Sequence, residues 1–270
     1  MAEIIPILEF LDLTIYEIVL IILEVVFIFL WALNIGHFGK RRKTDKSKVI
    51  KYIWLTSIFY ACAIIQLVDI LGLDQLTQQE AVFGFKFSIG YGAAVVFSTL
   101  ASFFFYAFGL EVFGKNPRKA KRSKLIFGLF DFPAGIMVLM GKIMRPYWTQ
   151  TLIFDMPVYD VLFLGGFVIH FVASLFLGIF LFVNTSKLAK YSDQRIDRVS
   201  FRLMSLSGVS VVGSYLLWIV EGLVSPADVS IWGLAGWGFA ILISFFMYLG
   251  YVQPKFFKKM FEEKEIHIRT

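Results

Sequence analysis

The 270-residue chain is 58% hydrophobic and 18% aromatic, and its formal net charge is +6. A soluble globular domain contains roughly 45–50% apolar residues, so this composition excludes an ordinary soluble fold. The positive charge would indicate nucleic-acid binding in a soluble protein, but the placement of the charges explains it without nucleic acid. Cys62 is the only cysteine, which excludes an intramolecular disulfide and CxxC chemistry.

Seven apolar runs follow one another along the chain, and most of them reach the roughly 20 residues that a helix needs to cross a bilayer. We expect transmembrane helices over 15–36, 50–72, 83–112, 125–143, 159–183, 203–223 and 230–252. The third run is longer than a bilayer requires and should tilt or project beyond the membrane. The fourth contains Pro133, which predicts a kink. The expected fold is all-α, a polytopic integral membrane protein with seven transmembrane helices.

Basic residues set the expected orientation. Of the 26 Lys and Arg residues, 23 lie in four stretches after the first, third, fifth and seventh runs: 37–52, 114–124, 184–202 and 253–270. Because basic segments remain in the cytoplasm, we expect a multi-pass protein of the cell membrane with its N-terminus outside and its C-terminus cytoplasmic. Residues 1–252 form the transmembrane domain, and 253–270 a short basic, amphipathic tail. Residues 1–16 contain no Lys or Arg, which argues against a cleavable signal peptide.

Four ionisable residues lie at similar depth near the expected outer surface: Glu17, Asp69, Lys86 and Glu221. An ionisable group in hydrocarbon costs roughly 2.5–3.5 kcal/mol or more, so each needs a partner or a purpose. One interpretation is a polar outer pocket that binds a small polar or cationic ligand, with Lys86 paired to Asp69. The other is a set of separate side chains that snorkel to the lipid headgroups.

Nearer the middle of the membrane lie Glu24 on the first run and His170 on the fifth. A carboxylate and an imidazole in one layer predict a proton relay or a pH-sensitive switch. The preferred alternative is two unconnected polar residues hydrogen-bonded within the bundle, because the first and fifth spans need not touch. On the cytoplasmic side, we expect Glu111 and Asp131 to form ion pairs with the basic segment 114–124.

Several chemistries are disfavoured, and we expect no enzyme activity, catalytic residue, metal site or cofactor. Retinal needs a Schiff-base lysine on the last helix, and residues 231–252 contain none. A membrane b-type haem normally needs two axial histidines, and only His170 is deep, because His37 lies at the inner interface and His267 in the tail. The sequence contains no HExxH, HxxxH, Walker or dinucleotide-binding pattern.

The seventh run ends in YLGYVQPKFF, with Tyr248, Leu249, Gly250, Tyr251 and Pro254 at the helix exit. With seven runs and basic inner segments, the chain resembles the seven-helix sensory region that precedes the kinase domain in some prokaryotic histidine kinases. The sequence has no HAMP, kinase or cyclase domain, so this resemblance implies a sensor or receptor that signals through a separate partner.

Two rival functions remain open at this point. A small transporter or channel would use Glu24, His170 or the outer cluster on a substrate path. A structural subunit of a larger membrane complex is the third possibility. In each case the expected partners are the lipid bilayer and other proteins, with no nucleic acid.

Overall fold

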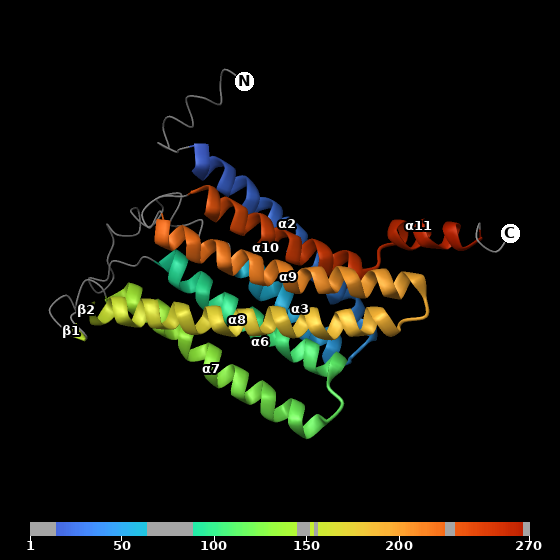
Figure 1. Cartoon of the computed structure of the whole chain (residues 1–270), viewed down its shortest axis with the longest axis horizontal. Coiled ribbons are helices and arrows are strands. Elements are labelled where there is room, and N and C mark those ends of the chain that lie inside the picture. Colours follow the sequence, from blue (N-terminus) through green and yellow to red (C-terminus); the bar gives the residue numbers. More distant parts are fainter. Residues whose placement is uncertain (1–14, 64–88, 145–151, 154–155, 225–229, 267–270) are drawn as a thin grey trace, which may run out of the picture.

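The computed structural model describes residues 15–63, 89–144, 152–153, 156–224 and 230–266 (Figure 1). Long helices dominate it: α2 (Ile15–Thr44), α3 (Lys48–Cys62), α6 (Ile89–Phe113), α7 (Pro117–Met144), α8 (Val158–Tyr191), α9 (Arg195–Val224) and α10 (Ile231–Met247). A turn of π-helix, η3 (Tyr248–Val252), continues α10, and α11 (Lys255–Ile266) follows it. Two-residue strands, β1 (Leu152–Ile153) and β2 (Met156–Pro157), pair antiparallel ahead of α8.

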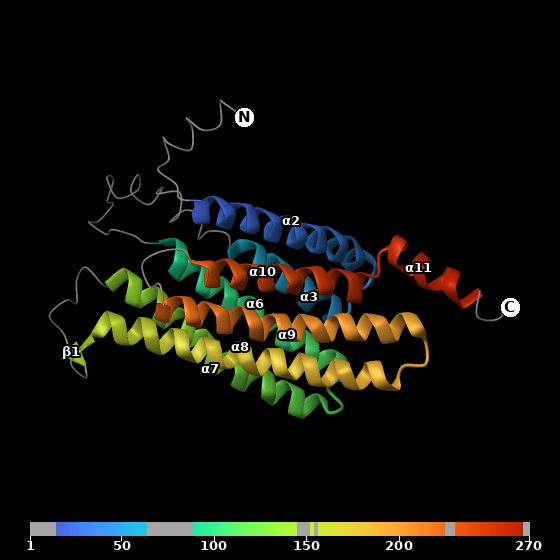
Figure 2. The same ribbon diagram turned by 45° about the horizontal axis from the view of Figure 1, so that its top comes forward.

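The seven long helices form a closed bundle. Each packs against the next one in the sequence, and α10 returns to pack against α2, so the first and last helices close the ring (Figures 1 and 2). The connections 45–47, 114–116 and 192–194 are short, which makes the helices they join antiparallel neighbours. Both views show α11 leaving the bundle at the end where these connections lie.

Within the described residues, six helical segments are long and apolar enough to cross a membrane: 18–44, 92–113, 117–141, 161–191, 195–221 and 231–252. Five of these segments, all except 92–113, carry exposed large apolar side chains, such as Ile22, Phe29, Leu129 and Val168. Exposed apolar surface of this extent is stable in lipid and unstable in water. The chain is thus a multi-pass membrane protein. Of the expected span 50–72, the structure describes the part that lies in α3, and the remainder falls outside the described residues.

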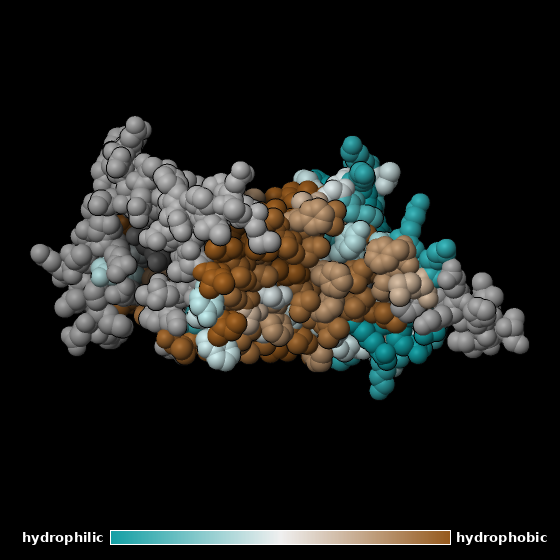
Figure 3. All heavy atoms as spheres, turned by 90° about the horizontal axis from the view of Figure 1, so that it is seen from above, coloured by the Kyte–Doolittle hydropathy of each residue, from teal (hydrophilic) through white to brown (hydrophobic). Residues whose placement is uncertain are grey.

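The helices extend beyond the expected spans at the basic end. α2 continues to Thr44 and α7 begins at Pro117, so several basic residues lie on helices and not in loops. Lys and Arg are good helix formers, and the side chain of Asn116 accepts hydrogen bonds from the first amides of α7. Figure 3 shows the result as a hydrophilic end beside a hydrophobic band.

Close backbone approach holds the second half of the bundle together. A Cβ added to Gly178 on α8 would lie 2.7 Å from the carbonyl oxygen of Gly208 on α9, and the reciprocal distance is 2.6 Å. Small residues at such crossings let two helices pack at short range. Pro133 does not end α7, which continues through it to Met144.

Aromatic side chains hold the other half of the bundle together. Trp31 on α2 stacks on Tyr60 of α3 with their ring centroids 4.9 Å apart. Phe27 on α2 meets Trp237 of α10 edge to face at 5.4 Å. These pairs fix α2 between its two neighbours.

Candidate functional site

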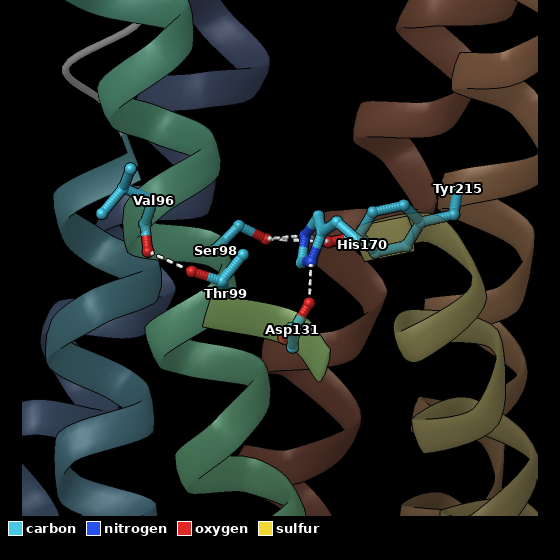
Figure 4. A network of polar contacts seen from close by, with 6 residues as sticks. All are labelled: Val96, Ser98, Thr99, Asp131, His170 and Tyr215. Carbon is cyan, nitrogen blue, oxygen red and sulfur yellow. Dashed lines mark hydrogen bonds and ion pairs between the residues drawn. The ribbon is translucent and has the colours of Figure 1, made fainter. Parts of the chain in front are cut away.

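His170 is the centre of a buried polar network. It lies in the interior of α8 with 2% of its side chain exposed, and Asp131 on α7 is fully buried. The Nδ1 atom of His170 lies 2.7 Å from Oδ1 of Asp131 (Figure 4). A carboxylate this close to a buried imidazole fixes the ring and stabilises a proton on Nδ1.

The other imidazole nitrogen faces two hydroxyl groups. Nε2 of His170 lies 2.7 Å from Oη of Tyr215 on α9 and 3.1 Å from Oγ of Ser98 on α6. These two hydroxyl oxygens are themselves 2.8 Å apart. The network therefore connects four consecutive helices, α6 to α9. Figure 4 also shows Thr99, whose hydroxyl instead donates to the carbonyl of Val96 on its own helix.

Glycines next to the network allow these contacts. A Cβ on Gly166, one turn before His170, would lie 2.5 Å from the carbonyl oxygen of Ala134, and one on Gly135 would lie 2.8 Å from Oγ1 of Thr99. Because neither glycine has a side chain, α7 lies close to both α6 and α8. The carboxylate on α7 is thereby brought within hydrogen-bond distance of the imidazole.

The network has two proton arrangements with different donor directions. In the first, neutral His170 donates its Nδ1–H to Asp131, and Nε2 accepts the hydroxyl proton of Tyr215. Uptake of one proton on Nε2 makes that nitrogen a donor, so the Tyr215 hydroxyl must turn its proton away and can then donate to Ser98. The Asp131–His170 pair changes from a net charge of −1 to zero, which is a large electrostatic change in a buried site.

Further buried polar atoms extend this layer. Within the part of the chain that the structure describes, Oδ2 of Asp131 has no hydrogen-bond partner. The hydroxyls of Ser102 and Ser174 lie near that of Tyr215 but form no hydrogen bond of standard length and angle there. Ser102 lies one helical turn from Ser98, and Ser174 one turn from His170. Buried polar groups are normally paired in proteins, so these atoms mark a site where polar contacts can form or change.

Glu24 is fully buried on α2, and neither of its carboxylate oxygens has a partner among the described residues. The hydrogen-bond partners of His170 come from α6, α7 and α9. The geometry therefore joins His170 to Asp131, and not to the Glu24 carboxylate with which the sequence had grouped it.

Of the four residues expected to form the outer cluster, the structure describes the side chain of Glu221. Oε1 of Glu221 accepts the backbone N–H of Ser230 at 3.1 Å, which ties the end of α9 to the start of α10. A carboxylate at this helix start also suits the helix dipole. Asp69 and Lys86 lie outside the described residues, as does the side chain of Glu17 on α2.

The expected ion pairs on the basic side are half correct. Nζ of Lys124 lies 2.5 Å from Oε1 of Glu111, as predicted. The prediction for Asp131 is wrong, because its carboxylate faces His170 in the core. Ser98 and Tyr215 were not predicted from the sequence, because hydroxyl groups in apolar runs usually bond to their own helix. The sequence did contain one indication of the pair, because Asp131 and His170 are an acid and a base on consecutive expected spans.

Among the described residues, no three His, Cys, Asp or Glu side chains come together as metal ligands would. The arrangement is instead suited to holding and moving protons. No family model, no curated protein and no solved structure matches the chain.

Proposed function

We propose that this chain is a sensor-like or receptor-like membrane protein whose buried Asp131–His170 pair acts as a protonation switch. The observation that carries the proposal is the 2.7 Å contact between two side chains that are 0% and 2% exposed. Histidine is the side chain whose charge changes most readily near neutral pH. The role agrees with the resemblance to the sensory regions of prokaryotic histidine kinases, and implies a separate signalling partner.

The seventh span and the orientation are part of the same proposal. α3 supplies the inner part of a span over 50–72. Apart from Lys142, the described basic residues lie at one end of the bundle, the end that is hydrophilic in Figure 3. The positive-inside rule then places that end in the cytoplasm and the N-terminus outside.

Packing links the switch to α10 near the proposed outer end, and α10 then runs back to the cytoplasmic end. The Tyr215 ring meets Trp218 edge to face at 5.3 Å, and Trp218 meets Trp237 of α10 at 5.6 Å. We expect reversal of the Tyr215 hydroxyl to change its hydrogen bonds and so to shift the ring against Trp218. α10 continues into the π-helix η3, and π-helical turns often occur at functional sites.

A proton-coupled transporter is the second candidate. The buried, unpartnered carboxylate of Glu24 favours it, because such a group in a membrane core often lies on a proton or substrate path. We rank the sensor first because the network is enclosed by packed helices. An enclosed pair suits a switch better than a conduit.

The test is a distance measurement across the network. Cys62 is the only cysteine, so spin labels can be placed at Lys119→Cys on α7 and Tyr191→Cys on α8 in a Cys62→Ser background. In nanodiscs, we expect the label-to-label distance to differ between about pH 5 and about pH 8. The His170→Gln variant should keep one distance throughout.

Equal distances at both pH values, or a change that survives in His170→Gln, would eliminate the switch. Proton and substrate flux into liposomes separates the two candidates. A sensor leaves the gradient intact, whereas a transporter dissipates it and loses that activity in Glu24→Gln.

A further inference from the structure

A groove of about 270 Å³ lies between α2 and α3 at the basic end of the bundle. Its lining consists of Gly39, Arg42, Lys43, Lys46 and Trp54. Three of these five residues are cationic and none is acidic. The groove therefore has the composition of a site for an anion of more than one charge.

Local structure explains why the groove forms. Gly39, Arg42 and Lys43 are three and four residues apart on the last turns of α2, so they share one face of the helix. Gly39 has no side chain, and a Cβ there would lie 3.3 Å from Nε1 of Trp54. The Trp54 indole can therefore lie against the backbone of α2.

Arg42 is held in an orientation suited to anion binding. Its guanidinium carbon lies 4.4 Å from the centroid of the Trp54 ring. Stacking uses the face of the guanidinium and leaves its in-plane N–H donors free for an oxyanion. Tryptophan is also a preferred residue at the membrane interface.

The positive charge of the groove is uncompensated within the part of the chain that the structure describes. Arg42, Lys43 and Lys46 form no ion pair there, whereas Arg41, on another face of α2, interacts with Asp45 at 3.9 Å. The nearby carboxylate of Asp45 accepts the backbone N–H of Ser47. That hydrogen bond lowers the Asp45 pKa.

The depth of the groove matches the headgroup layer. Leu33 is an exposed apolar residue on α2, and Gly39 lies six residues beyond it, about 9 Å along the helix axis. An occupant held there has its charged group in the groove and its hydrocarbon against the apolar surface of the bundle. We propose that the groove binds the phosphate headgroup of an anionic phospholipid.

The experiment uses the full chain in detergent micelles and counts bound lipid by native mass spectrometry. The probes are phosphatidic acid, phosphatidylcholine and inorganic phosphate. The variants are a groove variant (Arg42→Gln, Lys43→Gln and Lys46→Gln), Trp54→Leu, and a control (Lys119→Gln, Lys121→Gln and Arg122→Gln). The control removes the same charge from exposed positions of α7 at the same end of the bundle.

We expect the wild-type protein to retain phosphatidic acid in preference to phosphatidylcholine. The groove variant should bind phosphatidic acid at least about 10-fold more weakly than the control variant. Trp54→Leu should also weaken binding, although it removes no charge. Thermal unfolding of each variant checks that it is folded.

Equal losses in the groove and control variants would mean diffuse attraction to the basic end and would overturn the proposal. Full binding in Trp54→Leu would contradict the stacked-arginine geometry. Saturation by inorganic phosphate alone, with no added affinity for phosphatidic acid, would overturn the assignment of a lipid.

Discussion

Removal of either member of the Asp131–His170 pair should destabilise the protein by unequal amounts. His170→Leu leaves the Asp131 carboxylate buried and unpaired, and breaking a buried pair in this way costs about 3–5 kcal/mol. Asp131→Leu leaves a neutral imidazole whose Nε2 still accepts from Tyr215. The Nδ1–H alone loses its acceptor, at a cost of about 1–3 kcal/mol.

The double variant should recover part of this loss. With both side chains replaced by leucine, the hydroxyl groups of Tyr215 and Ser98 still have each other as partners at 2.8 Å. Neither an unpaired charge nor an unpaired imidazole proton remains. We expect the double variant to lose less than the sum of the single variants by about 0.5–3 kcal/mol.

The assay is reversible unfolding in mixed detergent micelles, followed by circular dichroism and tryptophan fluorescence. Acidification should restore stability to His170→Leu, because protonation removes the charge of the unpaired carboxylate. Additive losses in the two single variants, or equal small losses in both, would refute a coupled buried pair.

Four other predictions follow from the structure and the sequence. Gly208→Val should destabilise the protein by about 1–3 kcal/mol, because the new side chain would collide with the backbone of Gly178. Gly238→Ala should be nearly neutral, because a Cβ at Gly238 would have no neighbour within 4 Å. The same unfolding assay measures both variants. Glu221→Ala should cost about 1 kcal/mol by removing the acceptor for Ser230, and Glu221→Gln should retain most of that stability. A C-terminal fluorescent protein should fluoresce and a C-terminal alkaline phosphatase should be inactive, with the reverse result contradicting the proposed orientation. Lys86→Met and Asp69→Asn should each destabilise the protein and show a coupling of about 0.5–3 kcal/mol in the double variant, while additive effects would remove the case for an organised outer pocket.

The helices could be read from the sequence because lipid imposes a simple length rule on apolar runs. Residues 159–183 and 203–223 were expected as spans, and α8 and α9 contain them. The expected span 15–36 is shorter than the helix, because α2 continues through Lys40 and Lys43 to Thr44. The apolar run ends before the helix does. A helix satisfies its own backbone hydrogen bonds beyond the hydrocarbon, so it has no reason to stop at the interface.

The site was only partly predictable. His170 and Glu24 stood out because an ionisable group in an apolar run is costly. Asp131 was assigned to the basic segment because it lies within reach of residues 114–124, yet Lys124 of that segment pairs with Glu111 on α6. The rotation of α7 about its axis decides which of these partners Asp131 faces. That rotation depends on how closely the helices pack at Gly135 and Gly166. Such packing cannot be predicted from one sequence.

The most direct test of the switch is the proton occupancy of the His170 ring. With 15N-labelled histidine, the chain gives signals from three residues, and His170→Gln identifies the one of interest. We expect His170 to carry a proton on Nδ1 at high pH and on both nitrogens at low pH, with a midpoint equal to that of the spin-label distance change. A ring that keeps one protonation state from about pH 5 to about pH 8, while that distance still changes, would contradict the account.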